Sequence, residues 1–259
     1  ITARFRVRLR AESHGRRQSG PMCIHHGGRI AELTNLVEPS LWKKLRHGFH
    51  QAASSNWSNH LDARLLEGVT EGDYDTDAHG EIWFVIHGLS QSEPSSAAKI
   101  VEALVRRGIA ILESGASDPF DGDGAIGRRA HSRSERVISD SALRAPREFA
   151  TRMVPVVTEI VESNARADYH NEPFRPDTVW QFHSFGAAHD VSDELLDATM
   201  HAIALLAKED PDAARALLDP LRDKELRTTG LLVAAGYAGN PEALADDAVS
   251  WIEAHPGAL

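Results

Sequence analysis

The stretch "ALLAKEDPDAARALL", residues 204–218, is an apolar segment that stops at Glu-Asp-Pro and restarts directly afterwards. Proline fits the first position of an α-helix, where its missing N–H would lack a partner in any case. Asp210, immediately before Pro211, is a favourable N-cap residue. The stretch therefore predicts that one helix ends here and that a second one begins at Pro211 and packs back against the first.

The same phrase recurs as "LSQSEPSSAA", "LRAPREFA" and "AGNPEALA", which place Pro94, Pro146 and Pro241 at further helix starts. Asn240 is a second favourable N-cap. Leu89 lies five residues before its proline, as Leu206 does before Pro211. This repetition predicts a series of antiparallel helix hairpins.

The segments around these prolines have apolar residues at steps of three and four, the spacing of one buried helix face. Strand signals after residue 30 are few and short, so the sequence predicts an all-α fold. The predicted buried stripes are Ala97, Val101, Leu104, Gly108 and Leu112; Phe149, Met153, Val156 or Val157, and Ile160; Leu195, Thr199, Ile203 and Leu206; and Leu244, Ala248, Trp251 and Ile252.

The prolines are 52, 65 and 30 residues apart, whereas tetratricopeptide or ankyrin repeats hold near 33 or 34 residues and HEAT units near 40 to 47. We therefore predict an irregular α-solenoid of helix hairpins, a HEAT/TPR-like superhelix, over residues 28–259. The C-terminal "SWIEAHPGAL" repeats the phrase at Pro256 and then stops, so we expect the array to be truncated there. Residues 1–27 are predicted to be a basic, disordered leader.

The charge of the chain is unevenly distributed. The net charge is −10, with +7 on residues 1–50 and therefore −17 on residues 51–259. An acidic body argues against a broad nucleic-acid or anionic-membrane surface, which needs clustered positive charge. Cys23 is the sole cysteine, so neither an intramolecular disulfide nor a Cys-based zinc site can form. With no apolar run long enough to span a membrane and no secretion signal, we expect a cytoplasmic protein.

One acidic phrase invites a calcium hypothesis. In "DYDTDAHGEIWF", Asp73, Asp75 and Asp77 occupy positions 1, 3 and 5 of an EF-hand-like loop. Ala78 stands where the loop needs Gly, and Phe84 stands where it needs a bidentate Glu. A solvated acidic segment leading into a helix is the alternative interpretation.

A second phrase, "FGAAHDVSDE", resembles the His-Asp pair of the all-helical HD phosphohydrolases. In that family the adjacent pair binds a divalent metal, which activates water for attack on a phosphoester. The resemblance implies that His189 and Asp190 would be metal ligands. The outlying ligands would come from two further pairs of candidates, His170 or His183 and Asp246 or Asp247. The simpler interpretation is a helix start, with Ser192 as N-cap and Asp193 and Glu194 in the first turn.

The phrases "LRAPREFATRMVPVV", "LLAKEDPDAARALLDPLRD" and "LLVAAGYAGNPEALADDAVSWIEAHP" resemble the C-terminal helical-repeat region of bacterial STAND-type NTPases, over roughly residues 80–259. The resemblance implies a sensor that binds a foreign protein. The NTPase and effector domains of that family have no counterpart in this sequence, so no catalytic residue is carried over.

These observations predict a non-catalytic scaffold that binds a protein partner on the concave face of the superhelix, as in the sensor region of a STAND-type defence or signalling NTPase. We expect no cofactor, no metal, no membrane partner and no nucleic acid. The alternative functions are an HD-type metal-dependent phosphohydrolase acting through His189 and Asp190, and a structural helical domain.

Overall fold

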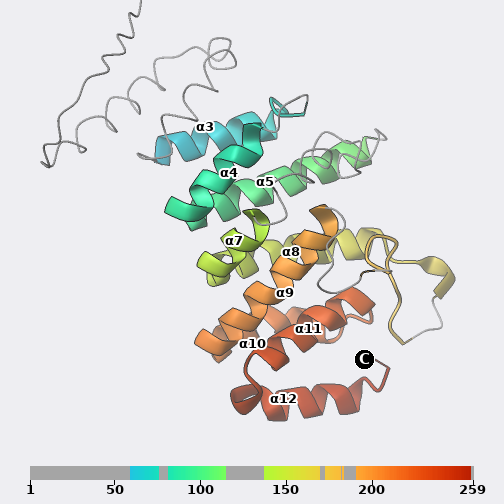
Figure 1. The fold of residues 1–259 in the computed structure, drawn as a ribbon. Coiled ribbons are helices and arrows are strands. Elements are labelled where there is room, and N and C mark those ends of the chain that lie inside the picture. The colour runs from blue at the N-terminus through green and yellow to red at the C-terminus, as the bar shows by residue number, and fades with distance from the viewer. Residues whose placement is uncertain are drawn as a thin grey trace, which may run out of the picture.

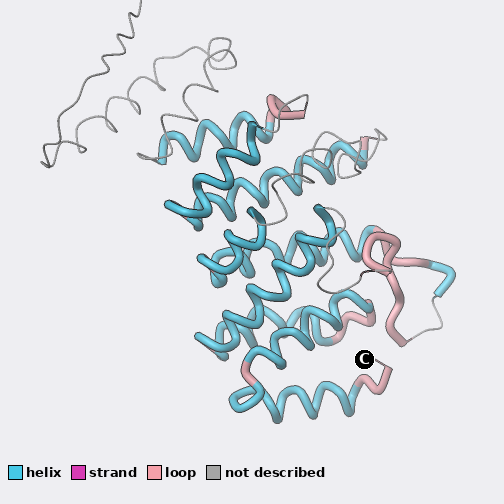
Figure 2. The backbone as a smooth tube through the Cα atoms, in the orientation of Figure 1, coloured by secondary structure: helices cyan, strands magenta, loops and turns pink. Residues whose placement is uncertain are grey.

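The structure, a computed structural model, is helical almost throughout the part of the chain that it describes (Figure 2). Within that part, β-structure is limited to two isolated bridges, Ala165 with Asp177 and Arg175 with Leu226. The all-α prediction is therefore confirmed there, whereas the predicted leader, residues 1–27, lies outside it. None of the described helices has both the length and the hydropathy needed to cross a bilayer. The described residues are 59–75, 81–114, 137–169, 173–181, 183 and 191–257.

The helices follow one another down the molecule in Figure 1, joined by short turns or by longer connections. Their bounds are α3 Asn59–Thr70, α4 Glu81–Ser92, α5 Pro94–Glu113, α7 Val137–Arg144, α8 Pro146–Ser163, α9 Val191–Glu209, α10 Pro211–Arg222, α11 Arg227–Gly239 and α12 Pro241–Ala254, with a short 3₁₀ helix η2 at Ala167–Tyr169.

The four predicted helix starts are confirmed, because Pro94, Pro146, Pro211 and Pro241 are the first residues of α5, α8, α10 and α12. A single residue separates each of these helices from the one before it. All four linking residues have φ between −136° and −148° and ψ between 60° and 87°. Proline disfavours the α-helical region for the residue that precedes it, which favours a helix end at each of these four residues. Pro155 and Pro220, by contrast, lie inside α8 and α10.

The linking residue belongs to the hydrogen-bond ladders of both helices. At Glu93, Ala145 and Asp210 the backbone N–H donates to the carbonyl four residues earlier, over 2.7–3.1 Å. The carbonyl of the same residue accepts from the N–H four residues later, over 2.8–3.1 Å. The carbonyl acceptors of Glu93 and Asp210 are those of Leu89 and Leu206. The spacing of five residues between leucine and proline thus reflects the last hydrogen bond of the first helix.

Both predicted N-caps are confirmed. The side chain of Asp210 accepts from the N–H of Ala213 at 3.0 Å, and that of Asn240 accepts from the N–H of Ala243 at 3.1 Å. The Asn240 amide also donates to the carbonyl of Ala207. These bonds satisfy helix-start N–H groups that otherwise lack partners.

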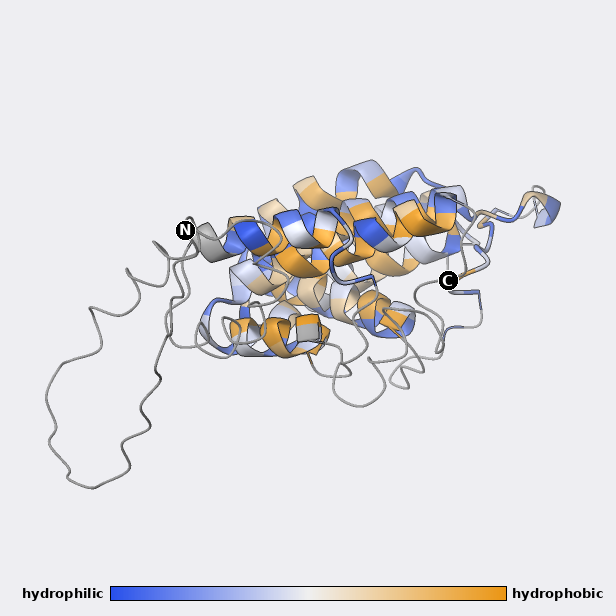
Figure 3. Cartoon of the chain, turned by 90° about the horizontal axis from the view of Figure 1, so that it is seen from above, coloured by the Kyte–Doolittle hydropathy of each residue, from blue (hydrophilic) through white to orange (hydrophobic). Residues whose placement is uncertain are grey.

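The helices form two layers, which Figure 3 shows from above, in a view turned by 90° from that of Figure 1. In the first layer α4 contacts α7, α7 contacts α9 and α9 contacts α11. In the second layer α3 contacts α5, α5 contacts α8 and α10 contacts α12. Across the layers each linked pair packs together, as α4 with α5, α7 with α8, α9 with α10 and α11 with α12. Contacts therefore run mainly between pairs that are neighbours along the chain.

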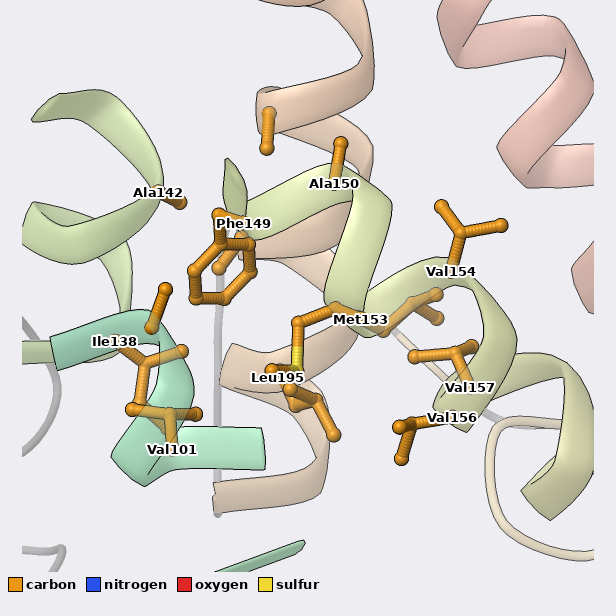
Figure 4. Packing of buried hydrophobic residues seen from close by; sticks show 14 of the residues in the cluster. Val101, Ile138, Ala142, Phe149, Ala150, Met153, Val154, Val156, Val157 and Leu195 are labelled. Atoms are coloured by element: carbon orange, nitrogen blue, oxygen red, sulfur yellow. The ribbon is translucent and has the colours of Figure 1, made fainter. Parts of the chain in front are cut away.

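The predicted apolar stripes line the interface between the layers, with two exceptions. Figure 4 shows how side chains of α5, α7, α8 and α9 interlock around Met153. Leu112 and Ile252, the last members of their stripes, are instead 41% and 44% exposed. Ile252 directly follows Trp251, which is buried, so Ile252 lies on a side of α12 that turns away from the core. Ile160 and Ala248 are half-buried against the core, and the other stripe residues are buried.

We expect Asn240→Ala to lower the free energy of unfolding by about 1 kcal/mol, because it removes the cap of α12. Urea denaturation followed by circular dichroism measures the change. The matched control is Glu93→Ala, since Glu93 has the same backbone conformation before a proline and its side chain forms no cap bond. Equal losses in the free energy of unfolding for the two variants would contradict the assignment of Asn240 as the N-cap of α12.

Candidate functional site

The residues on which the phosphohydrolase hypothesis rests are only partly described. His189, Asp190 and His170 lie outside the described ranges. Asp247 is described, and its carboxylate accepts from Nε of Arg215 at 2.7 Å. Among the described residues, no group of three or more His, Cys, Asp or Glu side chains is placed to hold a metal ion. The described part of the chain therefore adds no support to this hypothesis.

His183, a nominated outlying ligand, lies between two carboxylates of α9. Its side chain is 1% exposed, with Nδ1 2.7 Å from Oδ1 of Asp193 and Nε2 2.9 Å from Oδ1 of Asp197. Ionised carboxylates only accept hydrogen bonds, so this geometry favours a ring that is protonated on both nitrogens. The two carboxylates lie on opposite ring nitrogens.

The electrostatics agree with this geometry. Burial by itself lowers the pKa of His183, but the hydrogen bonds and charges of Asp193 and Asp197 outweigh it and raise the pKa above its ordinary value of 6.5. Next to this cluster, Nε1 of Trp180 donates to the carbonyl of Ser192 at 3.0 Å. Buried Asp177 accepts from the N–H of Trp180 at 2.6 Å. The bond from Trp180 to Ser192 joins the segment before α9 to the start of that helix, and the Asp177 bond stabilises a turn within the segment.

The acidic phrase proposed for calcium ends a helix. Gly72 has φ +81°, and the N–H of Asp73 donates to the carbonyl of Gly68 at 2.8 Å, which is the closing bond of a Schellman motif. The carboxylate of Asp75 binds Arg107, with Nη2–Oδ2 at 2.6 Å. Asp77 lies outside the described residues. Of the three aspartates considered for calcium, Asp75 is therefore paired with an arginine.

The second layer, formed by α3, α5, α8, α10 and α12, carries ion pairs that join one helix to the next. Arg106 of α5 pairs with Glu159 of α8 at 3.0 Å. Arg152 of α8 pairs with Glu102 of α5 at 2.8 Å. Arg215 of α10 pairs with Asp247 of α12 through the 2.7 Å bond described above. Two further pairs join α8 to the ends of α10, Arg147 with Asp210 and Glu162 with Lys224.

A groove of about 660 Å³ follows the outward face of α5 within this layer. The side chains that line it come from α3, α5 and α8, and most of them are charged or small. They are Leu66, Thr70, Lys99, Glu102, Ala103, Arg106, Arg107, Ala110 and Arg152. Most of the groove is thus built from one helix face, and the helices on either side supply the remainder.

A second cavity, of about 620 Å³, lies where α5 and α8 end and α9 begins. Its lining is mainly apolar and includes Ile109, Trp180 and Leu195. The exposed side chains of Leu112 and Val179 lie on the same cavity. Glu113 is its one charged lining residue among those described. The hydroxyl side chains of Ser163, Thr178 and Ser192 also line this cavity.

The sequence analysis did not single out the charged residues of the α5 groove. A local signal exists, because Lys99, Ala103, Arg106 and Ala110 recur at helical spacing on the face opposite the predicted apolar stripe. Asp75, the partner of Arg107, and Glu159, a partner of Arg106, come from other segments of the chain, which no local pattern connects to α5.

Comparison of the chain with protein-family models, with curated proteins and with solved structures finds no match.

We expect the stability that His183 contributes to depend on pH. Because its pKa is raised in the folded protein, the contribution is complete below pH 6.5 and is lost as the pH rises through the folded value. Urea denaturation at pH 6 and pH 9 should show that His183→Asn costs more stability at pH 6. The same substitution at His201, which is exposed on α9, is the control; a His183→Asn effect that is equal at both pH values would contradict the imidazolium assignment.

Proposed function

We propose that this protein is a non-catalytic scaffold that recognises another protein, built as an irregular α-solenoid of the HEAT/TPR-like type. The observation that carries this proposal is the one-residue link before proline, repeated four times with the same backbone conformation. Each linked pair then contacts mainly its neighbours along the chain. Arrays of this kind offer broad, rigid surfaces for binding macromolecules.

The second layer is the surface that we assign to recognition, as the concave face of the proposed superhelix. Its long charged side chains are held in fixed directions by ion pairs between helices. Side chains that are already ordered lose less conformational entropy on binding. The same layer contains the α5 groove.

We extend the proposal to the role that the resemblance to STAND-type NTPases implies, a sensor for a foreign protein in a defence or signalling system. The helices that begin at Pro146, Pro211 and Pro241 support this extension, because they lie in the segments that carry the resemblance.

A solenoid predicts that distant helix pairs open independently. Trp251 is buried at 1% exposure in α12, and replacing a buried Trp with Ala typically costs about 3–5 kcal/mol. In native-state hydrogen exchange, Trp251→Ala should accelerate exchange in α11 and α12 and leave α4 and α5 unchanged. Equal acceleration in all helices would indicate a single cooperative globule instead.

We expect proteins that bind this chain to contact the second layer. Protein binders are selected from a display library against the full chain. For one class of them, Arg152→Glu should lower the affinity at least tenfold, roughly, because the substitution reverses the charge of an ordered side chain on the second layer. Lys208→Glu, at an exposed position of α9 in the first layer, is the charge-matched control. A selection without binders, or binders insensitive to every second-layer substitution, would contradict the proposal.

A further inference from the structure

The outer face of α12 carries apolar side chains that are exposed to solvent. Val249 is 55% exposed and Ile252 is 44% exposed, and Ala245 is exposed as well. These residues are four and three positions apart, so they form one stripe along the helix. The buried side chains of α12, Leu244 and Trp251, lie on a different side. A surface helix normally has one apolar stripe, which faces the core, whereas α12 has a second one that faces solvent.

The outer stripe lies on the side by which second-layer helices contact the next helix of their layer. Counted from the first proline of each helix, the fifth residue of α10 is Arg215, which donates to the carboxylate of Asp247 and to the carbonyl of Ala243 in α12. The carbonyl of the twelfth residue, Arg222, accepts from Nε1 of Trp251 in α12 at 3.0 Å. The fifth and twelfth positions of α10 therefore face α12.

The ninth position has the same role in α5, where Glu102 accepts from Nη1 of Arg152 in α8 at 2.8 Å. In α12 the fifth, ninth and twelfth residues are Ala245, Val249 and Ile252. The corresponding residues of α10 are all charged. The side of α12 that corresponds to a helix–helix contact elsewhere in the layer is thus apolar, and no helix of the described part of the chain lies against it.

Three carboxylates border this stripe. Glu242, Asp246 and Glu253 are exposed on α12, and none of them forms an ion pair within the described part of the chain. The remaining carboxylate of α12, that of Asp247, binds an arginine of α10. Residues 227–254, which form α11 and α12, contain one Arg and four Asp or Glu, a net charge of −3. The negative charge beside the stripe is therefore not offset by ion pairs.

The chemistry of this face favours one kind of occupant. An apolar stripe on a helix takes the apolar stripe of another helix, and free carboxylates attract Lys or Arg side chains beside it. A second copy of the chain would place the same carboxylates against each other, and like charges at an interface are unfavourable. A nucleic acid would be repelled by them.

We propose that the outer face of α12 binds a basic amphipathic helix of a partner protein. The apolar side chains of that helix pack on Ala245, Val249 and Ile252, and its Lys or Arg side chains pair with the three carboxylates. This inference rests on the proposed recognition function and adds the place and the chemistry of one partner contact.

Fluorescence anisotropy with the full chain tests this inference. The probe is a fluorescein-labelled peptide of about 18 residues built from Leu, Ala and Lys, in which Leu forms one stripe at helical spacing and Lys borders it. One comparison peptide has the same composition with Leu scattered around the helix, and the other has Glu at every Lys position. In about 150 mM NaCl the probe should bind at least about tenfold more tightly than either. The scattered peptide measures unspecific attraction of a cation to an acidic protein.

Variants locate the binding site. Val249→Lys should weaken binding of the probe at least about tenfold, because it removes the central apolar contact and adds a charge of the same sign as the peptide. Leu143→Lys is the matched control, since Leu143 is 48% exposed on α7. Asp246→Lys should weaken binding about tenfold, and Glu71→Lys is its control, at an exposed position after α3 at the other end of the stack (Figure 1). Circular dichroism verifies that all four variants fold.

Absence of probe binding, equal binding of the probe and the scattered peptide, or equal weakening by a variant and its control would each overturn the inference. A dimer of the full chain in sedimentation equilibrium that Val249→Lys abolishes would assign the face to a second copy and would also overturn it. If the peptide fails but library binders still depend on Arg152, the recognition function stands and the helix-binding face of α12 is rejected. If the library selection yields no binder either, both proposals fail.

Discussion

The steric clash between a proline ring and the residue before it is the constraint on which the arrangement of this chain depends. It disfavours the helical region for Glu93, Ala145, Asp210 and Asn240, all of which lie outside that region. At the first three of these residues, one helix completes its last hydrogen bond and the next helix begins its first. Because only one residue is available to turn the chain, and its conformation is nearly constant, each turn redirects the chain in nearly the same way. His255, before Pro256, has the same conformation, with φ −130° and ψ 66°.

Nearly constant turns explain the two layers. A helix that ends at such a turn and the helix that follows it face each other across the apolar interface. The next pair can then bury its own apolar faces against the exposed side of the previous pair. The long helix α9 illustrates this, because it contacts α7 and α8 of one neighbouring pair and α11 of the other. The stripe from Leu195 to Leu206 is buried for this reason.

The charged side chains of the second layer have a different role from the core. Exposed ion pairs contribute little to stability individually, but a guanidinium that binds two carboxylates has few other positions available. Arg106 and Arg152 are therefore ordered at modest gain in stability, which is useful in a recognition surface. His183 is the opposite case, since its ring is buried and both nitrogens are used within the fold. Its ring therefore joins the segment before α9 to that helix.

Local sequence determined where helices begin, which residues cap them and which faces are buried. Pro94, Pro146, Pro211 and Pro241, the caps Asp210 and Asn240, and most of the apolar stripes could be predicted because each effect acts within about four residues. Only the tertiary structure decided that Leu112 and Ile252 are exposed, that Asp75 pairs with Arg107, and that His183 lies between Asp193 and Asp197. It also determined which residues line the α5 groove. Most of these features depend on which segments become neighbours, and no pattern within one helix specifies contacts between residues 32 or 53 positions apart, such as Asp75 with Arg107 or Arg106 with Glu159.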